Sequence, residues 1–262
     1  MIPARFIRRD NRFVARVELA GEETTVYVPN TGRCEELLFE GNQVYLKDHE
    51  GSSRKYRYSI EGVKKEDYWL SINSSMPNQL FKESYLKGEL DFLGLEGELE
   101  AEVSVSSRSR LDFKIGEAYL EIKGVTLDVQ GKAYFPDAPT ERGIRHLQEL
   151  SHLAQSTKAY LIYIVLTRSQ SFAPNPKDRA YTKAFWEAYE KGVKCIALAY
   201  EGFPRPVFKG VIPLEGEEMK RIQTIYEGDK KTNTMGCGEC QTSCQSACKT
   251  SCTVGNQGCE QK

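Results

Sequence analysis

The stretch SRLDFKIGEAYLEIK (residues 109–123) has the pattern of a β-hairpin that carries two acidic residues on one face. Apolar and polar residues alternate on both sides of Gly116, which predicts two half-buried strands joined by a tight turn. That turn sets Asp112 directly opposite Glu121. Like charges opposed across two strands destabilise a sheet, so this pair calls for a compensating charge. The residues expected to form the opposite, buried face are Leu111, Phe113, Ile115, Ala118, Leu120 and Ile122.

A divalent cation bound between the two carboxylates would remove their repulsion. Mg²⁺ and Mn²⁺ take oxygen ligands, and such an ion activates water and offsets charge in a phosphoryl transition state. Lys123 projects to the same face as Glu121 and can orient the water or stabilise the developing charge. Glu83, on the preceding predicted helix, can add an acidic ligand. The alternative is a solvated polar face, neutralised by Lys114 and Lys123.

Composition places few limits on the function. The chain has 262 residues, of which 40% are hydrophobic and 28% are charged, enough for one large core or two modest ones. Its formal net charge of −1 means that attraction to nucleic acid must come from local basic patches. The sequence has no apolar run long enough to cross a membrane, and its first ten residues lack an apolar signal-peptide segment. We therefore expect a cytoplasmic protein without membrane contact.

Residues 1–80 are expected to form an all-β domain. Short segments rich in β-branched and aromatic residues alternate there with Gly, Asn and Ser. Five such strands suit a small barrel of the OB type, a fold that often carries nucleic acid on one face. The strands are expected at 12–19, 24–29, 42–48, 55–60 and 68–73, with a domain boundary at 75–80.

Residues 81–213 are expected to form an α/β domain. Its buried strands alternate with amphipathic helices, which indicates parallel strands joined by right-handed crossovers. Helices are expected at 81–90, 141–155 and 178–192, and strands at 99–106, in the hairpin 109–123, and at 159–166 and 193–200. The remaining segment, 214–262, is poor in large apolar residues and is expected to be a linker and a disordered cysteine-rich tail.

Basic and aromatic residues alternate in RKYRY (54–58). Cations contact phosphates and aromatic faces stack on unpaired bases. Read as a strand, this segment places Lys55 and Arg57 on one face and its two tyrosines on the other, where core packing is the rival interpretation. The predicted nucleic-acid contacts in this part of the chain are Arg33, Arg54, Lys55 and Arg57, and Arg110 is added beside the acidic hairpin.

The predicted helix 141–155 carries Arg142, His146 and Glu149 on one face, at positions i, i+4 and i+7. This face can complete the carboxylate site and contact nucleic acid through Arg142 and His146. The rival interpretation is a surface ion pair.

Six of the eight cysteines lie within the last 26 residues, Cys237, Cys240, Cys244, Cys248, Cys252 and Cys259. Zinc is a possible ligand, but zinc sites usually join two separated pairs, often with histidine, and this segment has no histidine.

The chain up to about residue 213 resembles the sugar fermentation stimulation protein A (SfsA) family. The resemblance rests on VPNTGR (28–33), RKYRYS (54–59), SINSSMPN (71–78), SRLDF (109–113), EIKGVTL (121–127) and FPDAPTERGIRHLQEL (135–150). It implies an OB-like domain, a nuclease-like domain of the PD-(D/E)-x-K superfamily, DNA binding and a link to regulation of sugar utilisation genes. Asp112, Glu121 and Lys123 match the nuclease motif, with Leu111 in place of its usual proline.

The C-terminal segment, from MKRIQTI (219–225) to residue 261, resembles a SCIFF peptide, a six-cysteine ranthipeptide precursor. This resemblance implies a leader and a cysteine core that a radical-SAM maturase modifies by joining cysteine sulfur to nearby threonines. The implied acceptors are Thr242, Thr250 and Thr253.

Three functions follow as hypotheses. The first is a DNA-binding protein with a metal-dependent nuclease-like site. The second is a non-catalytic DNA-binding regulator of sugar utilisation genes. The third is a carrier for the modified C-terminal peptide.

Overall fold

The computed structural model describes residues 1–106 and 109–216. The predicted cysteine-rich tail, with its candidate modification sites, lies outside the described residues. Within residues 1–106 and 109–216, no helix is both long enough and apolar enough to cross a membrane.

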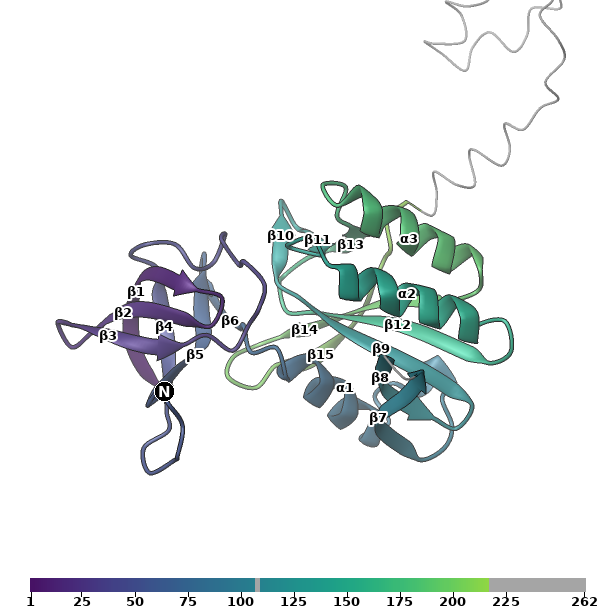
Figure 1. The fold of residues 1–262 in the computed structure, drawn as a ribbon, viewed down its shortest axis with the longest axis horizontal. Coiled ribbons are helices and arrows are strands. Elements are labelled where there is room, and N and C mark those ends of the chain that lie inside the picture. The colour runs from purple at the N-terminus through teal and green to yellow at the C-terminus, as the bar shows by residue number, and fades with distance from the viewer. Residues whose placement is uncertain (107–108, 217–262) are drawn as a thin grey trace, which may run out of the picture. The chain divides into compact units, whose positions relative to one another are not determined.

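The N-terminal domain is a closed β-barrel (Figure 1). Its sheet has the order β3-β2-β1-β4-β5-β6, and Tyr27 pairs in parallel with Ser59 to close β3 onto β5. Five strands thus form a ring in the order β1-β2-β3-β5-β4, which confirms the predicted OB-type barrel. The strands are β1 (Ile2–Asn11), β2 (Val14–Leu19), β3 (Glu22–Tyr27), β4 (Gln43–Asp48), β5 (Tyr58–Lys65) and β6 (Tyr68–Ser71).

Two parts of this domain differ from the sequence prediction. The strand expected at 55–60 begins only at Tyr58, so Lys55 and Arg57 lie in the β4–β5 loop and not on one face of a strand. The first strand, β1, was not predicted. Only Phe6 among its ten residues is fully buried, so the strand lacks a clear apolar alternation.

The second domain has a mixed six-stranded sheet of order β15-β14-β12-β9-β8-β7. Strands β9, β12 and β14 are parallel, and antiparallel strands flank them on both sides. A small sheet, β10-β11-β13, lies beside it. The elements are α1 (Met76–Leu86), a short 3₁₀ turn (Asp91–Leu93), β7 (Leu99–Ser106), β8 (Ser109–Ile115), β9 (Ala118–Val125), β10 (Leu127–Val129), β11 (Lys132–Phe135), α2 (Glu141–Leu153), β12 (Lys158–Val165), β13 (Ser171–Pro174), α3 (Arg179–Glu190), β14 (Lys194–Glu201) and β15 (Val207–Ile212).

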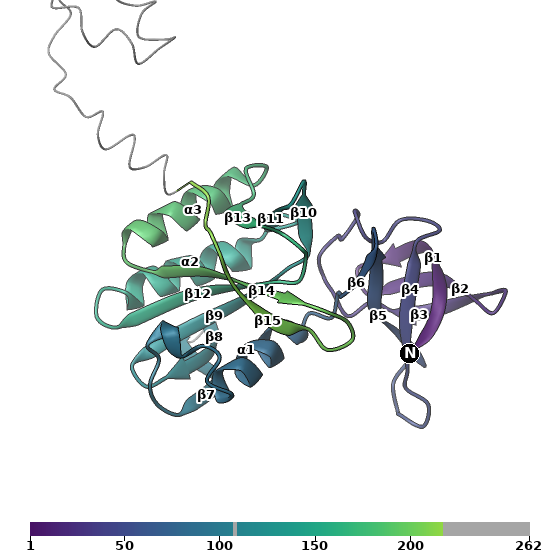
Figure 2. The same cartoon turned by 180° about the vertical axis from the view of Figure 1, so that it is seen from behind.

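Helices cover both faces of the large sheet, as Figures 1 and 2 show from opposite sides. Helix α1 buries Leu80 and Phe81 against one face, in a core cluster with Phe113 and Leu120. Helices α2 and α3 cover the other face, where Leu150 belongs to the second cluster. This arrangement confirms the predicted mixed α/β domain. The prediction was possible because strands buried on both faces have nearly continuous apolar sequences.

The hairpin and the helix before it differ from the prediction in two details. Leu111 belongs to the α2–α3 side of the core, whereas Phe113 belongs to the α1 side, so the apolar alternation of β8 breaks at Asp112. Helix α1 begins at Met76, five residues before the predicted start at 81. Pro77 stands at its first turn, a position that suits proline because no intrahelical donor is lost there.

Candidate active site

The hairpin has the predicted register from its turn outward. Ile115 pairs with Ala118, and the pairing continues to Phe113 with Leu120. There the regular pairing ends, and Oδ2 of Asp112 accepts the backbone N–H of Ile122 at 2.8 Å. The Asp112 carboxylate therefore occupies the position of a strand carbonyl, which opens the sheet beside Glu121.

Glu121 is buried, with 2% of its surface exposed, and one of its oxygens accepts two hydrogen bonds. Oε1 accepts hydrogen bonds from Nζ of Lys123 and from Nδ1 of His146. The other oxygen, Oε2, is buried and has no hydrogen-bond partner among the described residues. A buried carboxylate oxygen without a partner is costly, so this atom indicates a ligand that completes the site.

His146 reaches Glu121 because of how α2 begins. The Thr140 hydroxyl accepts the backbone N–H of Gly143 at 3.0 Å and caps the helix. His146 then faces the sheet, and Arg142, one turn earlier, donates from Nε to its Nε2 at 3.5 Å. With the proton on Nδ1, the ring accepts from Arg142 and donates to Glu121.

Asp112 is held from the opposite side by α1. Nδ2 of Asn78 donates to Oδ1 of Asp112 at 2.9 Å. The helix approaches β9 closely at Gly124, where a Cβ would lie 2.6 Å from Cγ of Pro77. A glycine is therefore required at this point for Asn78 to reach the carboxylate.

The two carboxylates have pKa values shifted in opposite directions. Burial and then the charge of Glu121 raise the pKa of Asp112, against hydrogen bonds from Ile122 and Asn78. Burial alone would raise the pKa of Glu121 as well. The hydrogen bond from His146 and the charge of Lys123 outweigh burial there, and the pKa of Glu121 is lowered.

The structure brings five of the predicted residues together, Asp112, Glu121, Lys123, Arg142 and His146. It does not bring Glu83 to them. Glu83 is exposed and lies five residues after Asn78, about 140° around the helix, and its charge acts on Tyr200 instead. Within the described ranges, no group of three or more His, Cys, Asp and Glu side chains is arranged to hold a metal. The acidic donor set is thus two carboxylates.

The alternatives left open for the hairpin and for α2 can now be judged by geometry. Lys114 pairs with Glu100 at 3.7 Å and not with the acidic pair. His146 is 3% exposed, so its contact with Glu121 is buried and is not a surface ion pair. Glu149 accepts a hydrogen bond from Ser106 and takes no part in the site. Asn78 was missed, because nothing in the local pattern separates it from an ordinary first-turn polar residue.

The other predicted nucleic-acid contacts are exposed, and in the described part of the chain their partners are residues other than Asp112 and Glu121. Arg57 is bound to Asp48 at 2.9 Å and to Glu50 at 3.2 Å. Nη1 of Arg54 lies 3.2 Å from the His49 ring, and Nζ of Lys55 lies 5.4 Å from the centre of the Tyr56 ring.

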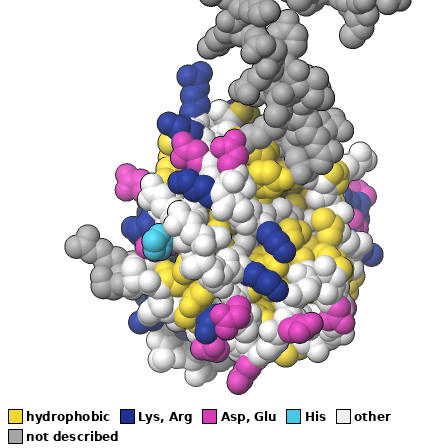
Figure 3. Space-filling model, turned by 90° about the vertical axis from the view of Figure 1, so that its right-hand side faces the viewer, with side chains coloured by type: hydrophobic (Ala, Val, Ile, Leu, Met, Phe, Trp, Pro, Cys, Tyr) yellow, Lys and Arg dark blue, Asp and Glu magenta, His cyan; other side chains and the backbone are white. Residues whose placement is uncertain are grey.

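Two further arginines each have one acidic neighbour. Arg33 lies 3.7 Å from Glu35, and Arg110 lies 3.8 Å from Glu102. On the face seen in Figure 3, the described Lys and Arg side chains are interspersed with Asp and Glu. That face shows no continuous basic patch among the side chains that the structure describes, so any DNA contact there depends on single cations.

Comparisons with known proteins agree with this architecture. Family models match in three consecutive ranges, the SfsA N-terminal OB domain at residues 7–72, the sugar fermentation stimulation protein RE domain at 75–204, and the six-cysteine peptide SCIFF at 220–261. These ranges assign the barrel and the α/β domain to one family and the C-terminal segment to another.

Relatives share most of their length with this chain. A sugar fermentation stimulation protein homolog of Desulfitobacterium hafniense is 39% identical over 206 residues, covering 75% of this chain and 87% of the relative. One of Acetivibrio thermocellus is 38% identical over 205 residues, covering 75% and 88%. The structure of Pyrococcus furiosus SfsA in complex with Ca²⁺ is 28% identical, with a TM-score of 0.74, over 82% of this chain and 95% of that one. The chain therefore belongs to the SfsA family, and it carries a SCIFF segment at its C-terminus.

Proposed function

We propose that this protein binds DNA and cleaves its phosphodiester bonds at a divalent-metal site formed by Asp112 and Glu121. The observation that carries the proposal is the unpartnered Oε2 of Glu121, buried next to a second carboxylate and within one network with Lys123 and His146. Such a pair is unfavourable by itself and becomes favourable around a cation.

The residues present fit a hard divalent cation. Both acidic side chains offer oxygen, the donor that Mg²⁺, Mn²⁺ and Ca²⁺ prefer. Two protein carboxylates are typical of Mg²⁺, which keeps several waters. The Pyrococcus furiosus relative, solved with Ca²⁺, supports a divalent cation without indicating which one acts here. When bound, the ion would supply an activated water and offset charge on the phosphoryl group.

The surrounding side chains prepare this site. The hydrogen bonds from Lys123 and His146 hold Glu121 in one orientation and favour its ionised form, which is the form that binds metal. Asn78 and the Ile122 N–H hold Asp112 in the same way. Of the groups that contact Glu121 directly, Lys123 can also reach substrate. It is partly exposed, and its ammonium can orient the attacking water or stabilise negative charge on a phosphate.

The direct test is a cleavage assay on single- and double-stranded DNA with Mg²⁺, Mn²⁺ or chelator. We expect cleavage with either metal, none in chelator, and none with Asp112→Asn. Cleavage that persists in chelator would contradict the proposal. DNA binding without cleavage under any of these conditions would favour a second function.

That second function is a non-catalytic DNA-binding regulator of sugar utilisation genes. One observation favours it: Oε1 of Glu121 already accepts from both Lys123 and His146, so half of the carboxylate is neutralised without a metal. A regulator should bind chosen DNA sequences in preference to others, and a binding assay with competing unrelated DNA measures this preference.

The SCIFF match supports a third role that is independent of DNA. We propose that a radical-SAM maturase modifies residues 220–261 by joining cysteine sulfur to threonine, with Thr242, Thr250 and Thr253 as acceptors. Each such thioether removes hydrogen, so coexpression with a maturase should lower the mass of the intact protein. An unchanged mass would contradict this role.

A further inference from the structure

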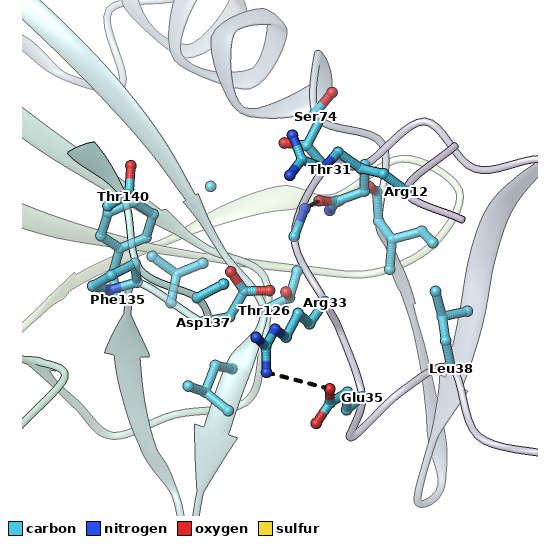
Figure 4. A pocket seen from close by; sticks show the side chains of 18 of the residues that line it. Arg12, Thr31, Arg33, Glu35, Leu38, Ser74, Thr126, Phe135, Asp137 and Thr140 are labelled. Carbon is cyan, nitrogen blue, oxygen red and sulfur yellow. Dashed lines mark hydrogen bonds and ion pairs between the residues drawn. The ribbon is translucent and has the colours of Figure 1, made fainter. Parts of the chain in front are cut away.

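A large cavity opens beside the acidic pair, between the loop after β3 and the segment that leads into α2. It has a volume of about 1020 Å³. Figure 4 shows Arg12, Thr31 and Arg33 on the barrel side and Asp137 and Thr140 on the α/β side. Residues far apart in the chain thus form one cavity from both domains.

The cavity wall is continuous with the candidate active site at three points. Gly124, which follows Lys123 on β9, lines the cavity. So does Pro77, which precedes the Asn78 that holds Asp112. Arg142 lines it as well and donates to His146. Asp112, Glu121, Lys123 and His146 do not themselves line the cavity, so its wall reaches the carboxylate pair through these three neighbouring residues.

Arg9 is one of four arginines in the wall, and both terminal nitrogens of its guanidinium already donate to backbone carbonyls, whereas its buried Nε has no hydrogen-bond partner among the described residues. It donates to the backbone carbonyls of Asn30, Gly32 and Arg33 and so holds the loop 30–33 in place. This arginine builds the wall and is not free for a ligand.

Two other arginines remain available. Arg12 and Arg142 are exposed, and neither forms an ion pair with a carboxylate in the described part of the chain. On the acidic side, Glu35 pairs with Arg33, Asp137 accepts the backbone N–H of Cys34 at 3.3 Å, and Glu141 also lines the cavity. The wall thus holds four arginines against three carboxylates, a small cationic excess that suits a ligand with phosphate groups.

One aromatic side chain is also available. Phe135 packs on Tyr163 and Tyr181 and belongs to the core. Tyr134 lines the cavity, is half-buried, and makes none of the aromatic ring contacts found among the described residues. Unpaired bases stack on such rings, whereas bases inside a duplex are already stacked on one another.

The volume of the cavity suits a short stretch of single strand. Pockets for small ligands measure about 300–1,000 Å³, and this cavity is slightly larger than that range. A few unpaired nucleotides fit the volume, and the preference for unpaired over paired bases rests on the ring of Tyr134.

We propose that this cavity binds an unpaired DNA strand and leads it to the carboxylate pair, with Arg12 on a phosphate and Tyr134 stacked on a base. The inference rests on the proposed function for the choice of DNA, and it specifies the substrate as single strands or unpaired tails. In this arrangement, Arg142 contacts the DNA strand at the end of the cavity that lies next to His146.

The test is a binding titration in chelator, so that cleavage plays no part. A labelled single-stranded oligonucleotide and the same sequence as a duplex are compared by fluorescence anisotropy at several salt concentrations. We expect the single strand to bind more tightly. Arg12→Ala should reduce its salt dependence by about 0.7 in the log–log slope, the value of one phosphate contact. Arg5→Ala, which removes an equally exposed arginine outside the cavity, should leave the slope unchanged.

The ring is tested by a matched pair of variants. Tyr134→Leu should weaken single-strand binding roughly five- to a hundredfold, the range for loss of one stacked base, while Tyr134→Phe keeps the affinity. Equal loss in both variants, or preferred binding of the duplex, would overturn the inference.

A cleavage arm separates this inference from the proposed function. With Mg²⁺, a duplex bearing an unpaired tail should be cut in the tail or at the junction. If no DNA is cut but single-strand binding still depends on Arg12 and Tyr134, the nuclease function fails and the strand site stands. If duplex DNA is cut equally well by wild type, Arg12→Ala and Tyr134→Leu, the strand site fails and the nuclease function stands.

Discussion

The hairpin β8–β9 and the segment 54–58 both interleave charged residues with uncharged ones, but they place those charges in different surroundings. In the hairpin, Glu121 is 2% exposed and accepts hydrogen bonds from residues 2 and 25 positions away. In the loop, Arg57 is exposed and pairs with Asp48, its neighbour at the end of β4.

The difference shows which kind of charge pattern produces a chemical site. Burial strengthens electrostatic interactions, so each group in the hairpin network depends on all the others, and the two carboxylates acquire opposite pKa shifts. Exposed pairs are screened by water and salt and contribute little. The hairpin should therefore respond strongly to single substitutions, and the loop weakly.

The largest effect is expected from Lys123→Met, which keeps most of the side-chain stem and removes the charge. Since Lys123 is the cation beside the pair, DNA cleavage should fall by roughly a hundredfold or more while metal binding persists. Lys114→Met, on the neighbouring strand and paired with Glu100, is the matched control and should retain activity. Equal rates for wild type and Lys123→Met would remove lysine from the mechanism.

Metal should stabilise the folded protein in proportion to its binding. At a hundredfold excess over the dissociation constant, Mg²⁺ or Mn²⁺ should raise the free energy of unfolding by about 2.7 kcal/mol. Asp112→Asn should abolish this increment. Thermal melts with metal and with chelator measure both quantities, and an unchanged melting temperature in wild type would mean that the pair is structural.

In chelator, Asp112→Asn should be at least as stable as wild type. The amide of Asn78 can turn so that its oxygen accepts from the introduced amide, whose own oxygen still accepts the backbone N–H of Ile122. Both hydrogen bonds then persist and the repulsion from Glu121 is gone. A variant that melts lower than wild type in chelator would show that the Asp112 charge stabilises the hairpin.

The pH dependence of that difference follows from the pKa of Asp112. Because folding raises this pKa, the folded protein binds the proton more tightly than the unfolded chain does, and wild-type stability falls as pH rises through the raised value. The advantage of Asp112→Asn in chelator should therefore be full at neutral pH and vanish below about pH 4, the ordinary pKa of aspartate. Unfolding of both proteins across pH measures it. A difference that grows toward acid pH would reverse the assigned sign.

The loop should show a smaller effect, confined to DNA binding. Replacing Arg54 and Lys55 by alanine should lower the slope of log affinity against log salt by about two phosphate contacts. Arg57→Ala alone should change it less, because Asp48 and Glu50 already neutralise that side chain. Lys191→Ala, exposed at the end of α3, is the control. An unchanged slope in the double variant would place the DNA surface elsewhere.

Removing the C-terminal segment should have the smallest effect on the fold. In the part of the chain that the structure describes, three core clusters are built from the barrel and from both faces of the large sheet. Truncation after Gly216 should therefore change the free energy of unfolding by less than about 0.5 kcal/mol, the range of surface changes. Chemical denaturation of full-length and truncated protein tests this, and unfolding of the truncated chain would contradict it.

Much of the fold was predictable from local patterns. Strand β7 was predicted at its observed bounds, and α2, β12, α3 and β14 within two residues, because long apolar periodicities report burial directly. The strands β1, β10, β11, β13 and β15 were missed. They are short or largely exposed, so their pairing depends on partners distant in the sequence.

The sequence by itself determined the hairpin and the identity of its acids. A tight turn at Gly116 and alternating apolar residues predict one register, which the structure follows from Ile115–Ala118 to Phe113–Leu120 and which brings Asp112 and Glu121 to the same end of the hairpin. These are local constraints, and they act within a short stretch of the chain.

Only the tertiary structure decided what surrounds the two acids. Asn78 and His146 reach them from helices on opposite faces of the sheet, and the same packing leaves Oε2 of Glu121 without a partner among the described residues and excludes Glu83. Such contacts depend on how helices pack, which no local pattern encodes. Their strength depends on burial, because a charge is worth far more once water is removed from around it.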